Sequence, residues 1–312
     1  MTIITGCEGP DLDGVACMIA YSELLNAKGI QSKAKYFGKL DLETNFVTKF
    51  TNYFPLDEGS YLHDADYVLV DTANPDIIDK NIPIDRVISV FDHRQLVFTN
   101  KFTNAELHIE LVGSCATLIT EEFQKAKVTP SINSATYLYS AIVFSTINFK
   151  NTVTTDRDIK AAEWLLSIAN TSESFVRDLF SAKSQISPSN LYEILSQDFS
   201  IKTLSDHKIG IAQIEMVNIN RFLSDLKQPL KEALSKLKTD NNLEYIFFNG
   251  IDVIDGYSLF IVIDSASADI FSSILGISRF EYSHQHPSII MRKQIWPKVE
   301  EHLKTRASEI AS

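Results

Sequence analysis

The sequence contains few cysteines. Cys7, Cys17 and Cys115 are odd in number and far apart, and no Cys-x-x-Cys pair is present. Small secreted scaffolds need paired cysteines, so this pattern argues against a disulfide framework and favours a reducing compartment. The first residues also lack the basic segment followed by an apolar one that typifies a signal peptide. We therefore expect a cytoplasmic protein.

Long apolar runs and an excess of positive charge are also missing. No uninterrupted apolar stretch is long enough to span a bilayer, so no membrane partner is expected. Lys and Arg total 29 against 40 Asp and Glu, a formal net charge of −11. Such a surface disfavours nucleic acid and anionic membranes as partners. An anionic substrate would need a local basic patch.

Three short apolar runs end in polar, mostly acidic residues. Residues 2–5 lead into a loop with Asp11 and Asp13, residues 67–70 end in Asp71, and residues 87–91 are followed by Asp92, His93 and Arg94. Such runs predict buried parallel strands, and ligands of open α/β sheets gather beyond the carboxyl ends of these strands. Converging carboxylates repel each other unless a cation lies among them, so a divalent metal site is predicted.

Each aspartate also has a simpler interpretation as a helix N-cap, in which its carboxylate accepts hydrogen bonds from free backbone N–H groups. For any one of them alone this interpretation is favoured, but its repetition at three strand ends favours a metal site. Asp92 is expected to orient the ring of His93, because a carboxylate beside a ligating histidine commonly does so.

The order of strand and helix patterns predicts the fold class. With 312 residues the chain is expected to form two domains. Alternating strands and helices predict a doubly wound α/β domain with a mainly parallel sheet over residues 1–180. The polar stretch 181–190 predicts a linker. Strand patterns around a helical, lysine-rich stretch at 219–237 predict a smaller C-terminal α/β domain with a mixed sheet over residues 191–312.

Six motifs follow one another in an order that is specific to one superfamily. They are Pro10-Asp11-Leu12-Asp13, Leu69-Val70-Asp71, Asp92-His93-Arg94, Gly113-Ser114-Cys115-Ala116-Thr117, the stretch 141–158, and Met291-Arg292-Lys293-Gln294. The chain thereby resembles the DHH phosphoesterase superfamily, and within it the manganese-dependent (family II) inorganic pyrophosphatases and related exopolyphosphatases. The resemblance implies a DHH-type metal-binding domain and a phosphate-binding, DHHA2-like domain. It also implies a divalent metal cofactor, manganese first, with magnesium, cobalt or zinc as alternatives.

The sequence departs from the family at two metal positions. The family's metal ligands fall on Asp11, Asp13, Asp71 and His93, which keep their ligand type, and on Cys7 and Ser145, which do not. Ser145 stands where the family has an aspartate shared by both metals. A neutral serine is a poor replacement, because hard divalent cations prefer anionic oxygen. Cys7 is either a soft ligand that favours zinc or iron, or a small packing residue.

The resemblance also places the phosphate-binding residues. Aligning the last motif from its left keeps Arg292 and Lys293 in register with the family's Arg-Lys pair, whereas aligning it from Gln294 puts Met291 at the arginine. The first register is favoured, since Arg292 could bind a phosphate bidentately. Lys202 either replaces a lysine that the family has two residues earlier or is a solvated surface lysine.

The resemblance predicts a hydrolase of phosphoanhydride bonds, acting on a small anionic phosphate such as pyrophosphate or short polyphosphate. Arg94 and Asp92 are the expected catalytic pair, although Arg94 replaces a histidine and cannot act as a general acid. The alternative is a degenerate, noncatalytic member that binds phosphate, nucleotide or a protein partner in the same cleft. A nanoRNase or cyclic-dinucleotide phosphodiesterase is disfavoured, because its Gly-Gly-Gly-His run is missing. A homodimer is left open.

Overall fold

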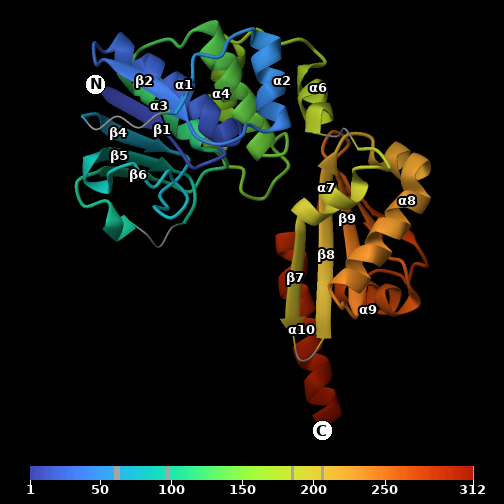
Figure 1. Cartoon of the computed structure of the whole chain (residues 1–312). Helices are drawn as coiled ribbons and strands as arrows, with labels where there is room; N and C mark the ends of the chain where they lie inside the picture. Colours follow the sequence, from blue (N-terminus) through green and yellow to red (C-terminus); the bar gives the residue numbers. More distant parts are fainter. Residues whose placement is uncertain (60–63, 96–98, 184–185, 205–206, 312) are drawn as a thin grey trace. The chain divides into compact units, whose positions relative to one another are not determined.

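The computed structural model describes residues 1–59, 64–95, 99–183, 186–204 and 207–311 (Figure 1). The chain divides into two compact units, Met1–Lys183 and Ser184–Ser312. Of the predicted linker 181–190, residues 184 and 185 lie outside the described residues, and its other residues include the end of one helix and the turn before the next. Each unit is described by itself below.

The first unit is built on a six-stranded parallel sheet with the strand order β3-β2-β1-β4-β5-β6. The order reverses between β1 and β4, which is the doubly wound arrangement. In such sheets the crevice at the reversal, beyond the carboxyl ends of the strands, is where ligands bind. The strands are β1 (Thr2–Thr5), β2 (Ser32–Tyr36), β3 (Asp57–Glu58), β4 (Asp66–Val70), β5 (Val87–Asp92) and β6 (Glu106–Ile109).

Helices α1, α3 and α4 pack against one another over one face of this sheet (Figure 1). Helix α1 is apolar on almost all sides, and Val15, Ala16 and Met18 are fully buried, as expected for a central helix. On the other face Tyr67 and Phe102 belong to a core cluster that the loop after β4 helps to cover. The helices are α1 (Leu12–Ala27), α2 (Leu42–Thr51), α3 (Cys115–Ala126), α4 (Ile132–Ser145), α5 (Asp156–Leu166) and α6 (Phe175–Lys183), with 3-10 turns at Ile84–Arg86 and Thr99–Lys101.

The second unit contains a five-stranded mixed sheet in the order β11-β10-β9-β8-β7, in which only β8 and β9 are parallel among the described pairs. Side chains alternate across β9, so Phe247 and Phe248 belong to different core clusters. The elements are α7 (Leu191–Gln197), β7 (Phe199–Leu204), β8 (His207–Met216), α8 (Ile219–Asp240), β9 (Tyr245–Asp252), β10 (Tyr257–Ile261), α9 (Ser265–Leu275), β11 (Ser283–His286) and α10 (Arg292–Ala311).

The predicted fold class is confirmed: a mainly parallel α/β unit is followed by a smaller α/β unit with a mixed sheet. The acidic residues singled out in the sequence follow β1 and β4 or end β5, and these three strands are adjacent. No helix in the described parts of the chain combines the length and the apolar character needed to cross a membrane.

Candidate metal centre

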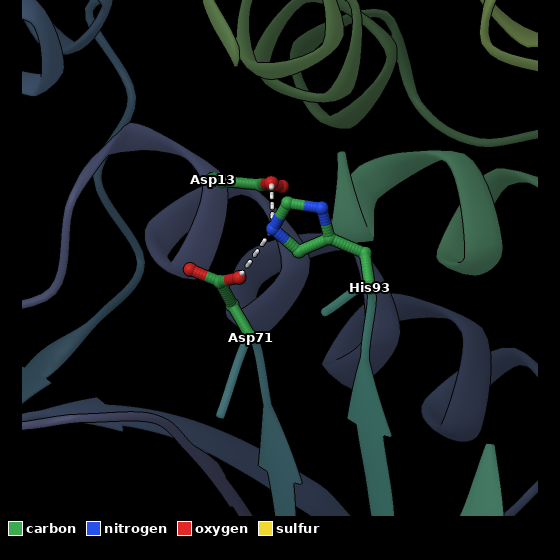
Figure 2. A group of neighbouring side chains, drawn as sticks. All are labelled: Asp13, Asp71 and His93. Carbon is green, nitrogen blue, oxygen red and sulfur yellow. Dashed lines mark ion pairs between the residues drawn. The ribbon is translucent and has the colours of Figure 1, made fainter. Parts of the chain in front are cut away.

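Three side chains meet at the point where the strand order reverses. Asp13 lies in the first turn of α1, Asp71 directly follows β4, and His93 directly follows β5. Their nearest ligand atoms all lie within 4.8 Å of one another. His93 Nε2 is 3.3 Å from Asp71 Oδ1 and 3.9 Å from Asp13 Oδ2, so the imidazole points at both carboxylates (Figure 2). The sheet topology therefore gathers these three predicted ligands.

Asp71 has an uncommon backbone conformation. Its φ of 56° lies in the left-handed region, where residues other than glycine are rare and aspartate is one of the better tolerated. The main-chain oxygen of Asp71 accepts a hydrogen bond from Nη2 of Arg94. Strained backbone of this kind concentrates at functional sites, where the surrounding structure holds it in place.

Asp13 is held by the N-terminus of α3. Its Oδ1 accepts hydrogen bonds from Ser114 Oγ at 2.9 Å and the Ala116 N–H at 2.9 Å, and its Oδ2 accepts one from the Cys115 N–H at 2.8 Å. Ser145 Oγ, at the end of α4, lies 3.5 Å from the same Oδ2. The side chain is almost fully buried, at 2% exposure. Free N–H groups at a helix N-terminus stabilise such a buried anion.

The imidazole of His93 is oriented from behind by a main-chain carbonyl. Its Nδ1 lies 3.1 Å from the oxygen of Val112, and because a carbonyl can only accept, Nδ1 donates there. This leaves Nε2 for the two carboxylates, which is the usual arrangement of a metal-ligating histidine. The prediction that Asp92 orients the ring is wrong. Asp92 Oδ1 instead accepts the His93 N–H at 2.7 Å and Arg94 Nε at 3.0 Å.

The electrostatics of the cluster favour a cation. Burial, followed by the charges of Asp13 and Asp11, raises the pKa of Asp71 well above its usual value. Burial and the charge of Asp11 likewise raise the pKa of Asp13, against the opposing effect of His93. Burial lowers the pKa of His93, but its hydrogen bond to Asp71 and the charge of Asp13 outweigh this and raise it to about 9. Without a metal, these contacts favour a protonated His93 beside the two carboxyl groups.

The donor set fits a divalent cation. Two carboxylates and one imidazole nitrogen offer three protein ligands with a fixed orientation, and three ligands leave positions open for substrate or water. Hard oxygen donors with one nitrogen suit manganese and magnesium, and they also admit zinc or cobalt.

Asp11 and Cys7 lie outside this three-residue group. Asp11 is the N-cap of α1, and its Oδ1 accepts the N–H groups of Asp13 at 3.0 Å and Gly14 at 3.1 Å. Its charge still acts on the cluster, because it contributes to the raised pKa of Asp71. Cys7 is partly buried, and burial followed by the charge of Asp71 raises its pKa to about 11. Both remain predicted ligands.

The basic residue of the third motif is bound to the centre itself. Arg94 donates through Nε to Asp92 Oδ1 at 3.0 Å and through Nη2 to the main chain of Asp71, with Asp71 Oδ1 at 3.4 Å. About half of its side chain remains exposed. The guanidinium therefore stabilises the strained turn at Asp71 and also presents positive charge to solvent.

The predicted phosphate-binding residues of the second unit already have partners. Arg292 Nη2 binds Asp198 Oδ1 at 2.5 Å, and its Nη1 donates to the main-chain oxygen of Asp198 at 2.6 Å. Lys202 Nζ binds Glu300 Oε1 at 2.8 Å and lies 5.2 Å from the ring centre of Trp296. Lys293 is the second residue of α10.

Comparison with known proteins first matches part of the chain to a domain family. Residues 177–302 match the DHHA2 domain, a range that begins in α6 and covers most of the second unit. The chain as a whole also resembles curated proteins. It is 26% identical over 296 residues to a probable manganese-dependent inorganic pyrophosphatase of Clostridium acetobutylicum, which covers 93% of this chain and 94% of that protein. It is 27% identical over 280 residues to the manganese-dependent inorganic pyrophosphatase of Bacillus subtilis, with coverage of 86% and 87%.

The fold has a solved counterpart. A crystal structure of a Methanococcus jannaschii protein assigned to the family II inorganic pyrophosphatases matches with a TM-score of 0.64 and 24% identity, covering 97% of this chain and 100% of that one. This likeness shows the two-unit α/β fold. With the DHHA2 domain and the curated relatives, it confirms the resemblance to the DHH superfamily.

Sequence reasoning did not find the residues that hold the ligands in place. Val112, Ser114, Cys115 and Ala116 contact Asp13 or His93 through main-chain atoms or a serine hydroxyl. Main-chain donors leave no residue-type signal. The Gly113–Thr117 motif marked this segment as part of the resemblance, but the motif alone could not show which ligands it holds.

Proposed function

We propose that this chain is a manganese-dependent hydrolase of phosphoanhydride bonds that acts on inorganic pyrophosphate or short polyphosphate. The observation that carries the proposal is the convergence of Asp13, Asp71 and His93 where the parallel strand order reverses. The names of the curated relatives support pyrophosphate as the substrate and manganese as the metal. Three free cysteines, at Cys7, Cys17 and Cys115, support a reducing, cytoplasmic location.

In this proposal Asp13, Asp71 and His93 hold the metal. A bound divalent cation would polarise phosphoryl oxygens and lower the pKa of a water molecule. The protein's own contribution is a fixed geometry: the N-terminus of α3 holds Asp13, and the Val112 carbonyl directs the His93 ring. Asp11 would be a further metal ligand, and Cys7 stands at another of the family's metal positions, as the resemblance implies.

Arg94 would stabilise negative charge on the phosphates, helped by the rigid support that Asp92 gives its Nε. It cannot supply the proton that a leaving phosphate needs, because a guanidinium stays protonated. That proton must come from solvent, so we expect slower turnover than in an enzyme with a histidine there. Asp92 therefore serves as the partner of Arg94 rather than as a proton donor.

Arg292, Lys293 and Lys202 are the proposed substrate ligands of the second unit. Two of them are paired with carboxylates, so a phosphate must compete with Asp198 for Arg292 and with Glu300 for Lys202. Arg292 presents two nitrogens to Asp198 in a forked arrangement, and a phosphate could accept the same fork.

A noncatalytic phosphate-binding protein is the second candidate. The observation that favours it is the hydroxyl of Ser145, which lies 3.5 Å from Asp13 where the resemblance calls for a carboxylate. A centre with one carboxylate fewer binds a second cation less tightly.

Phosphate release separates these candidates. The full chain is incubated with pyrophosphate, tripolyphosphate or long-chain polyphosphate, each with manganese, magnesium, cobalt or zinc. We expect turnover of pyrophosphate or tripolyphosphate, fastest with manganese and abolished by a chelator. If the protein binds manganese but releases phosphate from none of these substrates, the noncatalytic candidate is favoured. Failure to bind any of the four metals would overturn the metal centre itself.

A further inference from the structure

One segment contacts two members of the metal centre. The main-chain oxygen of Val112 accepts from Nδ1 of His93, while the N–H groups of Cys115 and Ala116 donate to the two oxygens of Asp13. These contacts come from a stretch of five residues that leads into α3. A shift of this stretch would therefore move the imidazole and a carboxylate together.

A buried carboxylate anchors this segment from the far side. Both oxygens of Asp158 accept the N–H of Gly113, at 3.0 Å and 2.9 Å, and Oδ1 also accepts the hydroxyl of Thr117 at 2.6 Å. Gly113 directly follows Val112, and Thr117 lies one residue beyond Ala116. Asp158 thus binds the segment at both ends of the stretch that reaches the metal centre.

Asp158 is itself fixed in place. It lies in the first turn of α5, where its Oδ2 accepts the N–H and the hydroxyl of Thr155, each at 2.7 Å, in a capping box. The side chain is fully buried, so the bonds are not exchanged with solvent. A buried charge with this many donors is oriented rigidly, because each lost bond would leave an unsatisfied polar group.

The backbone at Gly113 is packed too closely to accept a side chain. A Cβ atom at this position would lie 2.6 Å from Cγ2 of Thr146 and 3.0 Å from Oδ2 of Asp158. Thr146 is the neighbour of Ser145, whose hydroxyl faces Asp13. The close approach at Gly113 joins the start of α3, the start of α5 and the end of α4.

We propose that Asp158 is a positioning residue of the metal centre, which sets Asp13 and His93 through the segment 112–117. This inference rests on the proposed metal-dependent function. It predicts that Asp158 determines how tightly the centre binds manganese, in addition to its effect on stability. Outer residues of this kind typically change metal affinity by about 10–100-fold.

The test compares Asp158→Ala with Asp252→Ala in the full chain. Asp252 is an equally buried carboxylate in the second unit, where it accepts the N–H groups of Ile219, Ile254 and Asp255. Free manganese is titrated by electron paramagnetic resonance, and unfolding is followed in chelator. We expect Asp158→Ala to weaken manganese binding about 10–100-fold, with kcat largely recovered at saturating manganese. Asp252→Ala should lose stability but keep the wild-type affinity.

A finer pair covers the case in which Asp158→Ala does not fold. Thr117→Val removes only the hydroxyl bonded to Asp158, whereas Thr117→Ser retains it. The valine variant should bind manganese several-fold more weakly, and the serine variant should bind it as the wild type does. Wild-type affinity in both Asp158→Ala and Thr117→Val would overturn the positioning role alone. A wild-type protein that binds no manganese would overturn the proposed function with it.

Discussion

The charged residues of the candidate site have opposite environments in the two units. In the first unit the carboxylates of Asp13 and Asp71 converge in the interior, at 2% and 5% exposure, and His93 and Arg94 are the cationic side chains that pair with them in the described contacts. In the second unit Arg292 is paired with a half-exposed carboxylate. The first unit therefore stores unfavourable charge that a cation would relieve, whereas the second holds its charge in pairs that an anion must open.

The two arrangements differ in their free-energy cost because one is buried and the other is partly exposed. Buried like charges without a cation cost several kcal/mol by order of magnitude, and a bound metal can relieve this cost. The Lys202–Glu300 pair is 41% and 36% exposed, and such pairs contribute only about 0–1 kcal/mol. Metal binding should thus change the stability of the first unit strongly, and phosphate should displace carboxylates in the second at little cost.

The largest effect is expected from Asp71→Asn, which removes one of the two converging charges. Asparagine tolerates the left-handed backbone at this position, so the turn should persist. Because burial raises the pKa of Asp71, its ionised form is disfavoured in the fold, and a neutral amide should make the metal-free protein more stable at pH 8. Manganese affinity should fall by at least about 100-fold, and phosphate release with it. Calorimetric titration and unfolding in chelator measure both effects.

A matched variant lies at the start of α2, away from the three-residue group. Asp41 caps α2 by accepting the Thr44 N–H at 2.8 Å, and Asn is an equally good cap. Asp41→Asn should leave manganese affinity and stability unchanged. Should Asp71→Asn destabilise the metal-free protein instead, the carboxylates would not be in conflict and the contrast between the units would be lost.

The pH dependence of the metal-free protein tests the same conflict. Contacts with Asp71 and Asp13 raise the pKa of His93 to about 9, above the ordinary value of 6.5. A raised histidine pKa contributes stability that is fully present below pH 6.5 and is lost as pH rises through 9. The raised pKa values of the two carboxyls act in the same direction at lower pH. In chelator we expect the free energy of unfolding to fall by roughly 2–3 kcal/mol across this window.

His93→Gln provides the control for that measurement. Glutamine does not titrate, so the fall in stability between pH 6.5 and 9 should largely vanish. Manganese added to the wild type should flatten the same curve, because the metal takes the place of the proton. A wild-type curve that is already flat in chelator would show that His93 is not held by its carboxylate neighbours.

Ser145→Asp adds a third carboxylate to the two that already converge in the first unit. The serine hydroxyl lies 3.5 Å from Asp13 Oδ2, so a carboxylate there would repel Asp13 without metal and bind cations with it. We expect the metal-free protein to lose about 1–2 kcal/mol, and manganese affinity to rise. Phosphate release should increase many-fold if the wild type is limited by its missing ligand.

Ser145→Asn separates charge from size in this experiment. It should neither destabilise the metal-free protein by repulsion nor tighten manganese binding. Increased metal content without turnover in Ser145→Asp would favour the noncatalytic candidate. A wild type that hydrolyses phosphoanhydrides well, and loses activity on Ser145→Asp, would show a centre rebuilt around fewer carboxylates.

The sequence predicted the fold and the convergence of Asp13, Asp71 and His93 because their signals are local. Apolar runs that end in Asp71 and in Asp92-His93 mark strand ends, and the carboxyl ends of parallel strands share one edge. The apolar runs and the polar residues that end them are therefore enough to predict that Asp13, Asp71 and His93 lie close together. The final helix, Arg292–Ala311, was not predicted, since it contains Pro297 and begins inside a motif that was interpreted for phosphate binding.

The contacts that finish the site could not be predicted, because they depend on main-chain atoms and tertiary pairing. Asp92 and Val112 both lie beside the His93 turn, and only the three-dimensional path of the chain decides which one reaches the ring. The Asp198–Arg292 pair joins residues far apart in sequence. Arg292 has the residue type of a phosphate ligand, and no local pattern shows that it is already engaged.

The smallest effect is expected from Asp198→Asn, which tests whether an anion must open the ion pairs of the second unit. It removes the negative charge opposite Arg292 while its main-chain oxygen can still accept from Nη1. If Arg292 binds phosphate, the KM for pyrophosphate should fall about 2–5-fold with kcat unchanged, because a pair with a half-exposed carboxylate contributes only about 1 kcal/mol. Glu300→Gln, which releases Lys202, should act in the same direction. Glu244→Gln opens a similarly exposed pair with His207 and should leave KM unchanged. A lower KM in all three variants would indicate a general effect of the net charge, and an unchanged KM in Asp198→Asn would remove Arg292 from the substrate site.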